Sequence, residues 1–334
     1  MSASRFLTVL NHSLRASLAS RHLQGLRFLS TSTIRPVNCC QDEGEPSYKT
    51  VLYHVKDRVA YITLNRPEHL NAINYDMPGE IKAAVKRANN DDTVKVIILA
   101  GKGRAFCAGY DLKMSVERER GEDNIGNQKM PWDPYEDYRI AYFCTKSFMS
   151  LWHSYKPTIA KIHGYGIAGG SDMALCTDMV IMAEDAKIGY PPTRVWGCPT
   201  TAMWTFRLGP EKAKRMMLTG DLISGTEAAK MGLVLEAVPA DKLDETVQKL
   251  ADRMKTVPAN QLFFQKQVVN QVAEQMGLFQ AQRLSSLFDG MTRHSPEGLA
   301  FQKYSLAHGF KNAVKLRDSG EMDWTEEAKK YVKE

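Results

Sequence analysis

Two glycine-rich loops carry the residues of this 334-residue chain that are best suited to hold a negatively charged oxygen. The first spans residues 101–113 and the second spans residues 163–170. Glycine has no Cβ, so a ligand can approach the main-chain N–H groups closely. The first N–H groups of a helix also have no internal partner. We therefore expect the N–H groups of Tyr110 and Gly169 to converge on one carbonyl oxygen as an oxyanion hole.

One carboxylate lies close to the second loop. Asp172 follows Gly169 by three residues, at the start of the helix that this turn is expected to open. An anion-binding backbone and an acid–base group could then face one small site. The alternative is a tight strand-to-helix corner in which Asp172 is only a first-turn charge.

The elements that must position these loops are buried strands. Residues 94–100 form an apolar run and residues 158–162 predict a short buried strand, and each is followed by one of the glycine loops. If these strands are neighbours, both loops emerge at the same edge of a sheet, where ligands of α/β folds bind. Residues 51–55 and 59–64 predict a hairpin, and residues 77–89 predict an amphipathic helix. Together they predict a parallel or mixed sheet covered by helices.

The second half of the chain has mainly helical patterns. Residues 115–137 are highly charged and predict a loop or lid that does not fill a core. Asp133 and Asp137 in this segment are interpreted as solvated charges, with closure over the site as the alternative. We expect short strands at 179–183 and 187–189, and helices at about 138–155, 200–207, 210–218, 225–231, 240–256, 258–275, 277–290 and 296–314.

The start of the chain differs from the rest in charge. Its first 41 residues contain five arginines and no Asp or Glu, whereas the whole chain has a formal net charge of +6. The remainder is therefore near neutral, which gives no indication of a nucleic-acid partner. An Arg- and Ser-rich, acid-poor start is typical of a transit peptide. We expect residues 1–40 to be a mitochondrial transit peptide, residues 41–48 to be a linker, and the protein to act in the mitochondrial matrix; the alternative is a disordered basic tail.

Composition argues against other classes of site. The chain is 43% hydrophobic and 25% charged, and no apolar run approaches the about 20 residues that a membrane span needs. The six cysteines form no C-x-x-C pair and have no histidine cluster at metal spacing. We expect reduced thiols, no metal and no redox cofactor.

Four motifs, taken together, resemble the crotonase (enoyl-CoA hydratase/isomerase) superfamily. They occur in the order of that family and cover roughly residues 50–315. The motifs are Asn65-Arg66-Pro67 with Asn71-Ala72, residues 103–112, His163-Gly164-Tyr165 leading to Gly169-Gly170-Ser171-Asp172, and Leu218-Thr219-Gly220-Asp221 with Ala228-Ala229 and Gly232-Leu233-Val234.

The resemblance implies an α/β, crotonase-like fold of repeated ββα spiral turns with a helical C-terminal region. Residues 49–257 would form the crotonase core. Residues 258–334 would be helical, close the site and contribute to oligomerisation. The implied assembly is a homo-trimer or homo-hexamer, and the implied partner is an acyl-CoA thioester.

The resemblance also implies roles for individual residues. The N–H groups of Tyr110 and Gly169 would bind the thioester oxygen and stabilise an enolate, with Asp172 as acid or base. Coenzyme A is part of the substrate, so no separate cofactor is implied. The residues implied to contact substrate are Arg66, Leu70, Ala108, Lys113, Gly170, Pro192 and Arg194.

Three of these assignments have simpler alternatives. Lys113 is expected either to meet a phosphate of coenzyme A or to be a solvated loop charge. Arg194 could hold a second carboxylate on the acyl group, or it could form a surface ion pair. For Leu70 a packing role is favoured over a role in recognition.

The chain departs from the hydratase pattern where proton transfer is decided. Hydratases of this family carry two glutamates, but here the first position is Asp172 and the second falls at Pro192, which has no proton to exchange. We expect hydration or dehydration of an enoyl-CoA. The alternatives are an isomerase, a carnitinyl-CoA-type dehydratase or an acyl-CoA hydrolase that uses Asp172 alone, or a non-catalytic acyl-CoA-binding homologue.

Overall fold

The computed structural model describes residues 47–111 and 131–330. These residues belong to one compact unit, Ser47–Glu334. The predicted transit peptide, Lys113 and most of the predicted lid lie outside the described residues.

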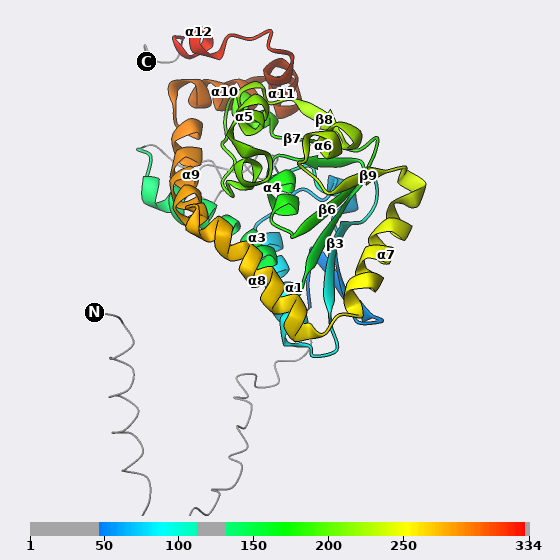
Figure 1. Ribbon diagram of the computed structural model, residues 1–334. Coiled ribbons are helices and arrows are strands. Elements are labelled where there is room, and N and C mark those ends of the chain that lie inside the picture. The colour runs from blue at the N-terminus through cyan, green and yellow to red at the C-terminus, as the bar shows by residue number, and fades with distance from the viewer. Residues whose placement is uncertain (1–46, 112–130, 331–334) are drawn as a thin grey trace, which may run out of the picture. The chain divides into compact units, whose positions relative to one another are not determined.

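A six-stranded sheet forms the centre of the fold (Figure 1). Its strands lie in the order β1, β2, β3, β4, β6, β9. β1 and β2 pair antiparallel, which confirms the predicted hairpin, and the other neighbouring pairs are parallel. The bounds are β1 Val51–Lys56, β2 Val59–Leu64, β3 Val96–Gly101, β4 Thr158–Ile162, β6 Met179–Ala183 and β9 Glu236–Val238.

The central strands are buried apolar runs. Every residue of β3 except Gly101 is buried, and so is every residue of β4 except Lys161. Strands that are buried on both faces need cover on both sides. α1 (Asp76–Asn90) packs on β1 and β2 and contacts α3 (Pro134–Trp152), whereas α7 (Leu243–Lys255) lies on the other side, against β3, β4 and β6 (Figure 1).

A smaller sheet carries the second glycine loop. β5 (Tyr165–Ile167) pairs parallel with β7 (Lys187–Gly189), which pairs antiparallel with β8 (Leu222–Ser224). α4 (Gly169–Leu175) follows β5 after a single residue, and all its residues are buried. The turn from β5 into α4 is therefore fixed inside the fold.

Helices α8 and α9 run consecutively along one edge of this unit, and α10 to α12 lie at its end beyond α5 (Figure 1). Trp196 and Val195 pack with Phe301 and Trp324 in a second apolar cluster. The C-terminal helices thus cover the loop at residues 190–199. The remaining bounds are α5 Met203–Thr219, α6 Gly225–Met231, α8 Ala259–Gln275, α9 Leu278–Arg293, α10 Pro296–His308, α11 Phe310–Ser319, α12 Trp324–Ala328, η1 Pro67–His69, η2 Pro191–Arg194 and η3 Ala240–Lys242.

Several predicted element boundaries were wrong, and two of them have a clear local cause. The helix expected at 296–314 is broken by Gly309, whose φ of 83° and ψ of 141° are not helical. The helix expected from residue 138 begins at Pro134, because the side chain of Asp133 caps it by accepting from the Tyr135 N–H. The predicted break near residue 209 is confirmed: Gly209 has a φ of 73° inside α5.

Candidate active site

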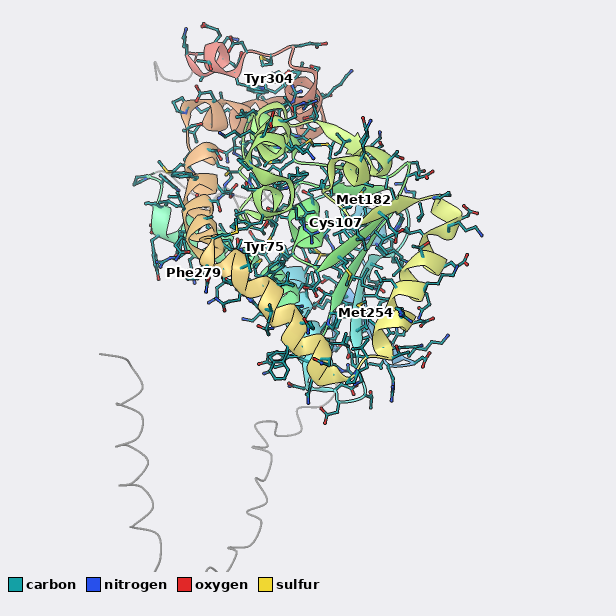
Figure 2. All side chains as sticks on the ribbon, in the orientation of Figure 1. Tyr75, Cys107, Met182, Met254, Phe279 and Tyr304 are labelled. Atoms are coloured by element: carbon teal, nitrogen blue, oxygen red, sulfur yellow. The ribbon has the colours of Figure 1, made fainter. Side chains whose placement is uncertain are left out.

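The two glycine loops lie side by side because β3 and β4 are parallel neighbours, as the apolar runs predict. The backbone of Cys107 joins the loops: its N–H donates to Tyr165 O at 2.8 Å, and its carbonyl accepts from Ile167 N at 3.0 Å. The Cys107 side chain lies in the interior, near α4 (Figure 2). The loops therefore form one continuous wall.

Gly109 allows the closest approach between the loops. Its φ is 94°, and a Cβ at this position would lie 2.9 Å from Ala168 Cβ and 3.6 Å from Gly169 N. A Cβ on Gly169 would lie 2.6 Å from Cε2 of Tyr110. No larger side chain fits at either position without displacing these neighbours.

The N–H groups of Tyr110 and Gly169 do not donate to any backbone carbonyl of the described residues. The neighbouring N–H groups are occupied: Asp111 N donates to Ile73 O, and Ala168 N donates to Gly189 O, both at 2.9 Å. Two amides from adjoining loops are thus available to an acceptor.

Next to these loops is a cavity of about 260 Å³. Ala108, Tyr110 and Ala168 come from the glycine loops, so the wall includes Tyr110 and the residue directly before Gly169. Most of the remaining lining comes from the loop at residues 190–200 and from α3, α9 and α11. The predicted site residues Ala108, Tyr110 and Pro192 all line this cavity.

Asp172 lies behind this wall. Its side chain is buried, and its two oxygens accept hydrogen bonds from Thr200 N at 3.1 Å and from Thr201 Oγ1 at 3.0 Å. Thr200 lines the cavity, whereas Asp172 does not. Burial raises the pKa of Asp172 to about 7, although these hydrogen bonds act in the opposite direction. Asp172 therefore can change protonation near neutral pH.

Two further predicted site residues, Arg66 and Gly170, help to fix the conformation of the glycine loops. Arg66 pairs with Asp111 at 2.8 Å and so holds η1 against the end of the first glycine loop. Gly170 packs on the backbone, since a Cβ there would lie 2.5 Å from Cys107 O.

The other two predicted site residues are Leu70 and Arg194, and contacts with neighbouring residues fix their positions. Leu70 has a φ of 51°, and its carbonyl accepts from Ala108 N at 3.0 Å. Arg194 faces Asp221 at 3.7 Å and is not part of the cavity wall, which favours the ion-pair interpretation.

The α9 wall of the cavity was not predicted. Asp289 and Arg293 are one helical turn apart on α9, form an ion pair and both line the cavity. Arg293 also pairs with Asp137 of α3 at 3.1 Å. Asp137 in turn accepts from Trp132 Nε1 at 2.8 Å and lies 3.2 Å from His294 Nδ1.

Asp137 was interpreted as a solvated loop charge, and this was wrong: its side chain is only 2% exposed. The hydrogen bonds and cations around it outweigh burial, so its pKa is lowered. The Asp–Arg spacing at residues 289 and 293 was a weak signal, because such a pair on a helix is usually exposed and Arg293 lies beyond the helix expected at 277–290.

Arg317 and Asp318 of α11 form a second ion pair on the cavity wall, whereas Tyr190 and Cys144 are uncharged there. Burial raises the pKa of Tyr190 well above its ordinary value, and its hydroxyl donates to Cys198 O at 3.0 Å. Burial also raises the pKa of the Cys144 thiol to about 12. Among the described residues, no group of three or more His, Cys, Asp and Glu side chains is placed to hold a metal ion.

The sequence profile described as enoyl-CoA hydratase/isomerase matches residues 54–304. The chain belongs to this family. The crystal structure of an enoyl-CoA hydratase from Mycobacterium smegmatis is 46% identical, has a TM-score of 0.76, and matches over 81% of this chain and 94% of that one. A probable enoyl-CoA hydratase of Mycobacterium bovis is 31% identical over 265 residues, 76% of this chain and 95% of the relative. A probable mitochondrial enoyl-CoA hydratase of Dictyostelium discoideum is 32% identical over 222 residues, 64% of this chain and 73% of the relative.

Membership confirms the predicted crotonase fold and the predicted class of enzyme. The chain is an acyl-CoA enzyme of the enoyl-CoA hydratase/isomerase type, and its cavity lies beside the two glycine loops. No described helix combines the length and apolar character required to cross a bilayer.

Proposed function

We propose that this chain hydrates an enoyl-CoA and that the N–H groups of Tyr110 and Gly169 bind the thioester oxygen. The observation that carries the proposal is the pair of amides without a backbone acceptor where the two glycine loops adjoin the cavity. Hydration places negative charge on the thioester oxygen as water adds to the β-carbon. Two fixed donors stabilise that charge, and one such donor is worth ~10²–10³ in rate.

Asp172 is the proposed proton donor to the α-carbon. Its pKa of about 7 gives it both protonation states near neutral pH, which suits a group that gives and takes a proton. Because Thr200 and Thr201 hold its oxygens behind the wall, the proton reaches the cavity by way of a water molecule or a rotation of the side chain.

The test is a substitution that disturbs the amide pair. In Gly169→Ala, the new Cβ would lie 2.6 Å from the buried ring of Tyr110, so the two N–H groups would separate. We expect hydration of crotonyl-CoA to fall by ~10² while coenzyme A binding remains. Gly79→Ala is the matched control, because the nearest atom to its new Cβ is Phe143 Cζ at 3.7 Å. Equal rates for Gly169→Ala and wild type would exclude the proposed oxyanion hole.

Double-bond isomerisation is the second candidate, because Pro192 lines the cavity where the resemblance implies a second glutamate. Mass spectrometry of the product distinguishes the two reactions: hydration adds one water to the thioester, and isomerisation leaves its mass unchanged. A thioester that binds but stays unchanged would instead indicate a non-catalytic homologue.

A homo-oligomer is part of the proposal. Phe264, Val268 and Val272 recur at every fourth residue of α8, and all three are exposed. Phe279 continues this apolar strip on the outer edge of α9 (Figure 2). Such a strip is larger than a single exposed residue and is typical of an interface. We expect a trimer or hexamer by light scattering, with smaller species for the Val268→Asp/Val272→Asp variant; a monomeric wild type would refute this part.

We also propose action in the mitochondrial matrix without a separate cofactor. The support for the location is the Arg-rich, acid-free start of the chain, together with the relative from Dictyostelium discoideum whose name includes mitochondrial. A fluorescent protein fused behind residues 1–40 should enter mitochondria, and a diffuse signal would contradict the proposal. Full hydration by dialysed protein without added cofactor is expected.

A further inference from the structure

A hydratase needs a group that takes a proton from the attacking water, and this group must reach the cavity. Among the described residues that line the cavity, the carboxylates are Asp289 and Asp318. The side chain of Asp318 is 42% exposed and pairs with Arg317. The side chain of Asp289 is 10% exposed. Asp289 therefore is the carboxylate that meets the enclosed part of the cavity.

Asp289 is fixed to the loop that carries Pro192. Its Oδ1 accepts from Cys198 N at 2.9 Å, and its Oδ2 pairs with Arg293 Nη1. Pro192 lines the same cavity six residues before Cys198. A carboxylate from α9 is thus placed beside the loop in which the sequence has no acid.

Resting on the proposed hydration, we infer that Asp289 is the catalytic base that takes a proton from water in this chain. The water oxygen bonds to the β-carbon as its proton passes to the Asp289 carboxylate. The electrons of the carbon–carbon double bond move onto the thioester oxygen, which the N–H groups of Tyr110 and Gly169 hold. The α-carbon then takes a proton from Asp172, and solvent returns the proton of Asp289 to Asp172.

Arg293 is the positioning residue of this arrangement. It pairs with both Asp289 and Asp137, so its side chain cannot turn away without losing two ion pairs. Burial raises the pKa of Asp289, and the Arg293 guanidinium opposes that rise. The pairing favours the ionised form, which a base requires.

The neighbouring tyrosine and cysteine side chains that the structure describes do not offer a competing base. The Tyr110 and Tyr190 hydroxyls have pKa values raised well above their ordinary value by burial, so both stay protonated. The Cys198 thiol has a pKa raised to about 12 for the same reason. Asp172 is close enough to be affected by the charge of Asp289, which is consistent with two carboxyl groups that serve one site.

The experiment separates the two proton transfers. Hydration of crotonyl-CoA needs both, whereas exchange of the α-protons of butyryl-CoA in D₂O needs only the oxyanion hole and the group at the α-carbon. In Asp289→Asn, we expect hydration to fall by ~10²–10⁴ while α-proton exchange stays near the wild-type rate. In Asp172→Asn, both rates should fall.

The matched control is Asp178→Asn, which makes the same change in a buried ion pair away from the cavity. Asp178→Asn should lower stability and leave both rates of the folded enzyme unchanged. Asp289→Glu keeps the negative charge that pairs with Arg293, so it replaces Asp289→Asn in the experiment if that variant does not fold. In Asp289→Glu, the rate of hydration should fall more than the rate of α-proton exchange.

Unchanged hydration in Asp289→Asn, or equal loss of hydration and exchange in the folded variant, would overturn the assignment. If wild type neither hydrates crotonyl-CoA nor exchanges the α-protons of butyryl-CoA, the proposed function itself is wrong. These results are distinguishable because wild type is measured in both assays.

Discussion

Two largely buried pairs of a carboxylate and a cation involve the C-terminal helices, and they differ in their surroundings. Lys266 of α8 lies 2.8 Å from Asp178 and also donates to Leu151 O at 3.1 Å and Lys156 O at 3.2 Å. Arg293 of α9 pairs with Asp289, and both line the cavity.

The difference teaches that pairing and burial alone do not make a catalytic group. Asp178 accepts from Thr158 N at 2.7 Å and does not line the cavity. Asp289 has open space beside it and the loop of Pro192 next to it. The cavity therefore decides which carboxylate can exchange a proton with a ligand.

Arg293→Met should have the largest effect on stability and activity, because it removes the cation that Asp289 and Asp137 share. We expect a loss of about 3–5 kcal/mol in the free energy of unfolding, as for other broken buried pairs. Hydration should also fall, and its acidic limb should move to higher pH, because Arg293 lowers the pKa of Asp289. Urea denaturation and the pH–rate profile measure these effects; an unmoved limb would contradict the role of Arg293.

Lys266→Met should separate stability from activity at the other pair. Burial raises the pKa of Asp178 and lowers that of Lys266, so both charges are costly to bury. We expect a loss of about 3–5 kcal/mol in the free energy of unfolding, because Asp178 is left unpaired. The rate per folded molecule should not change.

The double variant Lys266→Met/Asp178→Asn sharpens this prediction. Removing both charges should recover much of the lost stability, since replacing a whole buried pair is often neutral. A double variant as unstable as the single one would show that the charges are not the cause.

Asp172→Asn should change the pH dependence of stability. The folded pKa of about 7 lies above the ordinary value of 3.8, so the folded state binds more protons between these values. The bound proton of Asp172 therefore contributes to stability below pH 3.8. This contribution decreases as pH rises from 3.8 to about 7 and is absent above that range. The variant should lack this slope in urea titrations; an unchanged slope would place the proton elsewhere.

Trp132→Phe is expected to have the smallest effect. It removes the hydrogen bond from Trp132 Nε1 to Asp137 but leaves the pairing of Asp137 with Arg293. We expect a loss of about 1 kcal/mol in the free energy of unfolding and a small decrease in hydration. Thermal melting measures the change in stability, and steady-state rates measure the change in hydration. A loss of hydration as large as that of Arg293→Met would contradict the expected ranking of the two variants.

The backbone part of the site could be predicted from sequence because its requirements are local. A glycine at 109 or 169 is needed where two loops touch, and the strands before them are apolar runs that pair in parallel. The fold class follows from the same runs and the helical patterns after them.

The α9 wall could not be predicted in the same way. An Asp and an Arg four residues apart on a helix are usually an exposed pair, and only the packing of α9 against α3 buries Asp289 and Arg293. The position of Asp172 on α4 was predictable, but not the contacts with Thr200 and Thr201 that place it behind the wall. Sequence spacing does not specify how a helix is rotated against a distant loop.

The most direct test of the proposed oxyanion hole is a crystal structure of the protein with butyryl-CoA bound. We predict that the thioester oxygen lies about 2.7–3.1 Å from both Tyr110 N and Gly169 N, the distance expected of oxyanion-hole donors. A thioester oxygen bonded to other groups, with these two amides beyond hydrogen-bond reach, would contradict the account.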